Sequence, residues 1–105
     1  MDIRKTFSFP SVPRRRLGDF HMACVSSQVM PPGVSSDTAI IESFKLDSDW
    51  EEKSLGAEVT IRGTDELIDR YVQNLKRWLK EAHMEEVGTS MVVVNVARII
   101  VTNVR

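Results

Sequence analysis

Cysteine is almost absent from this chain: Cys24 is the only one among 105 residues. An intrachain disulfide is therefore excluded, and with it the cross-linked framework typical of small secreted domains. No apolar run approaches the roughly 18 residues that a membrane-spanning helix needs. The apolar stretch Phe7–Pro10 is too short for the hydrophobic region of a signal peptide. We therefore expect an intracellular, cytoplasmic protein with no membrane partner.

Glycine and net charge are also low. The five glycines are scattered singly, so the sequence contains no glycine-rich loop for binding phosphate. The formal net charge is −1, which gives no overall attraction to nucleic acid or to acidic membranes. Hydrophobic residues make up 42% and charged residues 28%, values typical of a globular protein. A chain of this length and composition is expected to form one domain with one modest core.

The clearest predicted element is an amphipathic helix of about 20 residues that follows Gly63. Thr64 is a suitable N-cap, because its hydroxyl can accept a hydrogen bond from an unpaired backbone N–H. Apolar residues then recur at intervals of three and four, and we expect this stripe to pack on a sheet. Leu75 and Trp78 are predicted core residues, and Gly88 suits the end of the helix. The stripe comprises Leu67, Ile68, Tyr71, Val72, Leu75, Trp78, Leu79 and Ala82.

Three segments before this helix are predicted to be strands. Residues 20–30 alternate weakly and end at Pro31, which cannot donate to a strand ladder. Residues 38–46 form a likelier strand, which places Ile40, Phe44 and Leu46 on one face. Residues 57–62 alternate cleanly, a pattern typical of a strand with one solvated face. The inward residues of this last strand are Ala57, Val59 and Ile61.

The C-terminal segment, residues 91–104, is rich in β-branched residues and apolar at both odd and even positions. This composition favours a strand, and a strand that is apolar on both faces is typically central and covered on each side. Because only one helix is predicted, one sheet face is left without cover, and large exposed apolar patches are rare on monomers. The N-terminal segment is poor cover for it because of its prolines and arginines, so we expect a second copy at that face, and the alternative is another protein. The candidate interface residues are Trp50, Val92, Val94, Val96 and Ile100.

Residues 1–18 are predicted to form a basic arm or irregular lead-in, punctuated by Pro10 and Pro13, with room for a short strand at Lys5–Phe9. Residues 19–105 then form the single α+β domain. Charge is uneven: residues 1–30 hold five basic and two acidic residues, whereas residues 37–69 hold ten acidic and three basic. We expect the arm to lie on an acidic surface of this chain or of a neighbouring subunit. The alternative is contact with an external polyanion.

The run Arg14, Arg15 and Arg16 is the candidate contact for a polyanion or a protein partner, because guanidinium groups bind phosphate and carboxylate in a bidentate manner. Phenylalanines flank this run at positions 7, 9 and 20, and aromatic residues accompany basic ones in nucleic-acid-binding domains. Trp50 lies in the acidic loop 47–54. It is expected to fold back over one end of the core, and the alternative is an interaction hot spot.

No catalytic, cofactor or metal site is predicted. A zinc site needs three or four converging ligands, and His21 and Cys24 on a strand would point to opposite faces. A nucleophilic pair of Cys24 with His83 lacks the third group that would orient it. The acidic run that starts at Asp47 has Glu52 where a calcium loop requires glycine.

These patterns together predict an α+β fold: a mainly antiparallel sheet of about four strands with one long amphipathic helix packed on one face. The leading hypothesis is a non-enzymatic protein-interaction module that forms a homo-oligomer, most simply a homodimer, through its sheet. The alternative is an RNA- or DNA-binding accessory protein that uses Arg14–Arg16. A third hypothesis is a small-molecule-binding or catalytic α+β dimer, with a pocket between helix and sheet. Many unrelated proteins share this plan, so the fold does not decide among the hypotheses.

Overall fold

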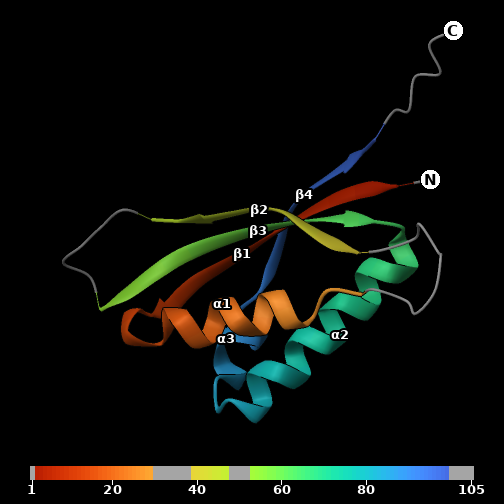
Figure 1. Cartoon of the computed structure of the whole chain (residues 1–105). Coiled ribbons are helices and arrows are strands. Elements are labelled where there is room, and N and C mark those ends of the chain that lie inside the picture. Colours follow the sequence, from red (N-terminus) through yellow and green to blue (C-terminus); the bar gives the residue numbers. More distant parts are fainter. Residues whose placement is uncertain (1, 30–38, 48–52, 100–105) are drawn as a thin grey trace, which may run out of the picture.

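A computed structural model describes residues 2–29, 39–47 and 53–99. Its four strands form one antiparallel sheet in the order β2-β3-β1-β4, and its helices lie together on one face of that sheet (Figure 1). The predicted α+β fold is therefore confirmed. In chain order the elements are β1 (Ile3–Pro13), a 3-10 turn (Arg14–Arg16), α1 (Leu17–Ser26), β2 (Ile40–Leu46), β3 (Ser54–Gly63), α2 (Asp65–Glu81), α3 (Glu85–Thr89) and β4 (Val92–Arg98).

Two of the three connections between consecutive strands contain helices. The chain passes through α1 between β1 and β2, and through α2 and α3 between β3 and β4, while β2 and β3 are antiparallel neighbours. This β-α-β-β-α-β order is the split β-α-β arrangement, which is also called ferredoxin-like. Because unrelated proteins with different activities share this arrangement, it indicates no activity by itself.

The N-terminal segment is a central strand, β1, which includes the short strand expected at Lys5–Phe9 but extends over Ile3–Pro13, where an irregular arm was otherwise expected. β1 pairs with β3 on one side and with β4 on the other. Pro10 and Pro13 are compatible with the strand because the pairing with β3 shifts register between Phe9 and Val12 and ends at Pro13. The buried residues of β1 are Ile3, Phe7, Phe9 and Val12.

Residues 20–30, which were expected to form a strand, belong largely to a helix. α1 ends at Ser26, and Phe20, Ala23 and Cys24 are its buried residues. These three residues are three and one positions apart, a spacing that places them on one face of a helix. The weak alternation of the segment hides this helical spacing in the sequence. The expectation of a single helix is therefore also wrong, and α1 supplies a second apolar surface beside α2 (Figure 1).

β3 matches its prediction, whereas β2 does so only in part. Ala57, Val59 and Ile61 are buried as expected. In β2 the pairing with β3 shifts register between Ile41 and Ser43, which places both Ile41 and Phe44 against the core. Phe44 and Leu46 share a face as predicted, since they pair with the buried residues Val59 and Ala57, but Ile40 does not, because the extra residue changes the alternation of the side chains before Ser43.

α2 confirms the predicted amphipathic helix over 17 residues. Its N-cap is Thr64, whose Oγ1 accepts a hydrogen bond from the Leu67 N–H at 3.2 Å. Leu75 is buried, but Trp78, the other predicted core residue, is 42% exposed. Trp78 lies at the margin of the stripe because the buried positions follow a narrower line along the helix. These positions are Ile68, Tyr71, Leu75 and Leu79.

The end of α2 also differs from the prediction. The helix ends at Glu81, and His83 adopts the left-handed conformation with φ of 58°, which is common just beyond a helix C-terminus. Gly88 lies buried within α3, where an added Cβ would come 3.3 Å from Cδ1 of Leu79. Gly88 therefore allows α3 to approach α2 closely and does not end α2.

Side-chain hydrogen bonds reach a carbonyl group at the C-terminal end of α1 and another at the C-terminal end of α2. The Tyr71 hydroxyl on α2 donates to the carbonyl oxygen of Cys24 on α1 at 2.8 Å. Arg16, the residue just before α1, donates from Nη2 to the carbonyl oxygen of Ala82, the residue just after α2, at 2.6 Å. Carbonyl groups in the last turn of a helix lack partners within the helix, so these two bonds fix how α1 and α2 lie against each other.

Candidate interaction surface

β4 is an edge strand, and within the described ranges it pairs with β1 alone. The prediction of a central strand covered on both sides is therefore wrong. Its valines are exposed by 49–54%, which leaves about half of each side chain in contact with solvent. The four valines are Val92, Val93, Val94 and Val96. No charged residue occurs from Val92 to Ala97, and Asn95 is the one polar side chain in this range, so we call this edge the apolar strip.

The pairing with β1 assigns the residues of β4 to the two faces of the sheet. Val93 pairs with Phe7, whose buried side chain marks the helix side. A register shift between Thr6 and Phe7 leaves Val94 as the extra residue of a bulge. By the same pairing, the helix side of β4 comprises Val93, Val96 and Arg98, and the open side comprises Val92, Asn95 and Ala97.

The open face of the central strands is polar. Arg4 Nε donates to Glu42 Oε2 at 2.7 Å, and the hydroxyl oxygens of Thr6 and Thr60 are 3.0 Å apart. The Glu42 carboxylate also raises the pKa of Arg4. The apolar second face expected from residues 91–104 is therefore not observed on these strands. The exposed valines belong to the edge of the sheet.

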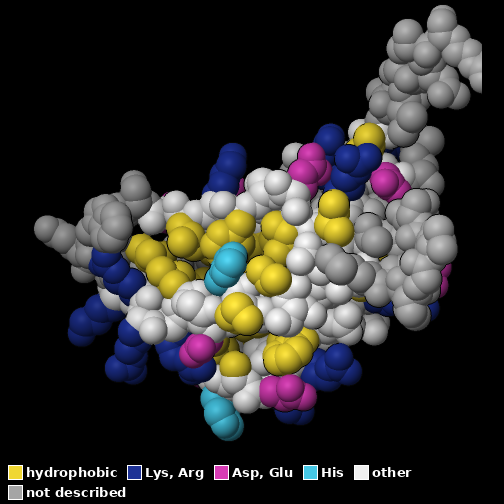
Figure 2. Space-filling model, in the orientation of Figure 1, with side chains coloured by type: hydrophobic (Ala, Val, Ile, Leu, Met, Phe, Trp, Pro, Cys, Tyr) yellow, Lys and Arg dark blue, Asp and Glu magenta, His cyan; other side chains and the backbone are white. Residues whose placement is uncertain are grey.

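A second group of exposed apolar residues lies on the opposite edge. Figure 2 shows hydrophobic side chains gathered over β2 and α1 and continuing onto α2. Met22 is the most exposed of these residues at 61%, and Leu46 and Trp78 are also exposed. The β2 strand itself carries Glu42 and Lys45 among its apolar residues, so this edge differs from β4 in charge.

The three consecutive arginines do not form one common site. They make a 3-10 turn between β1 and α1. Arg16 is committed to contacts within the chain, since it contacts Asp19 at 3.0 Å in addition to the Ala82 carbonyl. Arg14 and Arg15 line a hollow of about 760 Å³ together with Lys53. Lys53 is a basic neighbour of the arginines that no sequence pattern connects with them, because it is distant along the chain.

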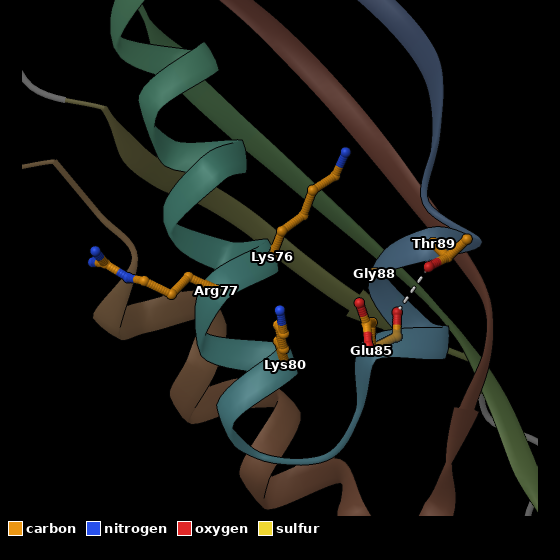
Figure 3. A pocket seen from close by; sticks show the side chains of 6 residues that line it. All are labelled: Lys76, Arg77, Lys80, Glu85, Gly88 and Thr89. Carbon is orange, nitrogen blue, oxygen red and sulfur yellow. Dashed lines mark hydrogen bonds between the residues drawn. The ribbon is translucent and has the colours of Figure 1, made fainter.

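A shallow cleft of about 400 Å³ separates the C-terminal half of α2 from α3 (Figure 3). In Figure 3, Lys76 and Lys80 lie on the cleft side of α2, whereas Arg77 points toward α1. α3 contributes Glu85 and Thr89, and the Thr89 hydroxyl donates to the Glu85 carbonyl oxygen at 3.0 Å. Basic residues are favoured near a helix C-terminus by the helix dipole, which accounts for both lysines.

Cys24 and the histidines lie apart. Cys24 is buried, and burial raises the pKa of its thiol to about 12, so the reactive thiolate is disfavoured. His21 is exposed on α1, and its ring packs edge-on against Phe44 of β2 at 5.1 Å between centroids. His83 is exposed after α2. Among the described residues, no three His, Cys, Asp or Glu side chains are placed to hold a metal ion.

Two predicted interface residues, Trp50 and Ile100, lie outside the described residues, as does most of the acidic run that begins at Asp47.

Within the described ranges, none of the helices has the length and apolar character needed to span a membrane. Comparison of this chain with protein-family models, with curated proteins and with solved structures gave no match.

Proposed function

We propose that this protein is a non-enzymatic interaction module that associates with itself through the β4 edge of its sheet. The observation that carries the proposal is the apolar strip Val92–Ala97, whose valines are half-exposed on a strand with a partner on one side among the described residues. An edge strand presents unpaired backbone N–H and C=O groups, which are a template for pairing with another strand.

The polarity of the sheet favours this edge over other contacts. The open face of the central strands carries polar side chains, some of which pair with one another, as Arg4 with Glu42 and Thr6 with Thr60, so burying it would gain little apolar contact. The opposite edge carries charges at Glu42 and Lys45, and charged residues discourage the addition of a strand. β4 has no such charges before Arg98. An uncharged strip can pair with a copy of itself around a two-fold axis.

Val94→Lys is the variant that tests the proposal. Val94 is half-exposed at a bulge, so a lysine there can reach solvent in the single chain, and we expect the variant to remain folded. In a pair of β4 strands the same lysine would put a charge into the contact. Sedimentation velocity from micromolar to millimolar concentration should show a wild-type dimer and a monomeric Val94→Lys protein.

The matched control is Leu46→Lys on the β2 edge, because Leu46 is exposed to a similar degree. This variant should associate like wild type. A wild-type chain that stays monomeric at millimolar concentration would contradict the proposal. So would a dimer that Leu46→Lys disrupts and Val94→Lys does not, since the contact would then lie over β2 and α1.

Binding to RNA or DNA is the second candidate function, and one observation favours it. Figure 2 shows Lys and Arg side chains gathered where β1 leads into α1, and Arg15 and Lys53 are exposed there. Replacing both by Ser should weaken binding and reduce the slope of log affinity against log salt by about two units. Lys45→Ser on β2 is the control. A wild-type chain that binds no RNA or DNA at low salt would exclude this function.

A further inference from the structure

The two ends of β4 carry opposite charges. Arg98 is the last residue of the strand, and α3, which immediately precedes the strand, carries Glu85 and Glu86. All three residues are exposed. Within the described part of the chain, none of the three has an ion-pair partner. Glu85 lines the cleft that also holds Lys76 and Lys80, whereas Glu86 is not among the residues that line it.

Arg98 and α3 lie on the same side of the sheet. Arg98 pairs with Ile3, whose side chain is buried on the helix side, and it lines a hollow with Lys5 and Val96. α3 lies below the sheet with the other helices (Figure 1). Lys5 in this hollow is already paired with Asp65 at 3.1 Å, whereas Arg98 has no such pair among the described residues.

We infer that two copies pair through antiparallel β4 strands with their helix layers on the same side of one continuous sheet. Each Arg98 then lies beside Glu86 of the partner copy. The orientation corresponds to a two-fold axis perpendicular to the sheet, which runs the second strand antiparallel and keeps both helix layers on one side, so the Arg98 end of one copy meets the α3 end of the other. This orientation rests on the proposed self-association through β4.

The helix-side valines support the same orientation. Val93 and Val96 both face the helix side, and directly opposed residues of paired strands share a face. Helix layers on the same side therefore allow Val96 of one copy to lie opposite Val93 of the other. If the second copy were turned over, its open face would continue the helix side of the first. Arg98 and the partner's Glu86 would then lie on opposite faces of the sheet.

The charges are expected to select the orientation more than to strengthen the contact. Exposed ion pairs contribute little to stability, whereas complementary charges fix register and disfavour wrong arrangements. Adjacent strands lie about 4.8 Å apart, so the end of one β4 is close to the segment that enters the other. Both Arg98–Glu86 contacts form together, because the two-fold axis repeats each contact.

A charge-reversal experiment tests the inference. Arg98→Glu alone and Glu86→Arg alone each place like charges at both contacts, so each homodimer should dissociate more readily, by on the order of tenfold in Kd. When the two variants are mixed, opposite charges face each other at both contacts again. Sedimentation of the mixture should show a heterodimer with an affinity close to that of wild type. The matched control is Lys45→Glu on β2, which should leave the Kd of self-association unchanged.

Salt and circular dichroism complete the test. Circular dichroism shows that each variant is folded, and the differences between variants should shrink at high salt because exposed charges are then screened. A dimer that Val94→Lys disrupts, but whose affinity neither charge reversal changes, would overturn the orientation and leave the proposed function standing. A wild-type chain that is monomeric throughout would overturn both.

Discussion

Replacing Tyr71 with Phe removes one hydroxyl group from the buried contact between α1 and α2. That hydroxyl donates to the carbonyl oxygen of Cys24 at 2.8 Å, and the Tyr71 side chain is fully buried. The carbonyl belongs to the last turn of α1, where intrahelical donors run out. Phenylalanine keeps the ring and nearly the same volume, so the substitution isolates the hydrogen bond from the packing.

The expected cost follows from leaving one acceptor buried without a partner. Such a group costs about 1–3 kcal/mol, more than the net gain from an average hydrogen bond. A domain of this size has a free energy of unfolding of roughly 5–15 kcal/mol. For a chain of about 100 residues, each kcal/mol lowers the Tm by roughly 4–8 °C. Tyr71→Phe should therefore melt at least several degrees below wild type.

Urea unfolding followed by circular dichroism measures this cost. The midpoint should fall while the m-value stays unchanged, which indicates a loss of stability without a change in the surface exposed on unfolding. The control is Thr89→Val, which removes an exposed hydroxyl that donates to the Glu85 carbonyl at 3.0 Å and should change stability by less than about 0.5 kcal/mol. If Tyr71→Phe were as stable as wild type, the assigned role of this hydrogen bond would be refuted.

Three further predictions concern the core. Leu75 is 1% exposed, so Leu75→Ala should cost about 2–5 kcal/mol, whereas Trp78→Ala on the exposed margin of the helix should cost clearly less; equal midpoints in urea would contradict the burial of this face. The Cys24 thiol should react with a thiol reagent at the rate at which the protein unfolds, because burial raises its pKa to about 12, and rapid labelling of the native chain would contradict this. The same shift predicts that the protein loses stability at alkaline pH. The Cys24 thiol ionises near its ordinary pKa of 9.0 in the unfolded chain and near 12 in the folded protein. The contribution of the neutral thiol to stability is therefore complete below pH 9 and declines as the pH rises toward 12. Burial raises the pKa of Tyr71 as well and acts in the same direction, so Cys24→Ala should reduce the slope of stability against pH without abolishing it.

Local patterns in the sequence predicted the elements whose periodicity is regular and uninterrupted. Thr64 and the apolar stripe after it predicted α2, and the alternation at Ala57, Val59 and Ile61 predicted β3. Elements with irregular patterns were predicted wrongly. Pro10 in β1 indicated an irregular segment, although a shift of register accommodates it, and α1 alternates weakly enough to resemble a strand.

The sequence by itself determined that residues 92–98 form an apolar strand, because β-branched residues favour the extended backbone. The tertiary structure alone decided that this strand lies at the edge. Its only described partner is β1, about 90 residues earlier in the chain, as in the pairing of Ile3 with Arg98. The sequence pattern shows which side chains are apolar. Whether other parts of the protein bury them depends on contacts between segments that are distant along the chain. For the same reason, only the packing of α1 beside α2 shows that Tyr71 completes the last turn of α1.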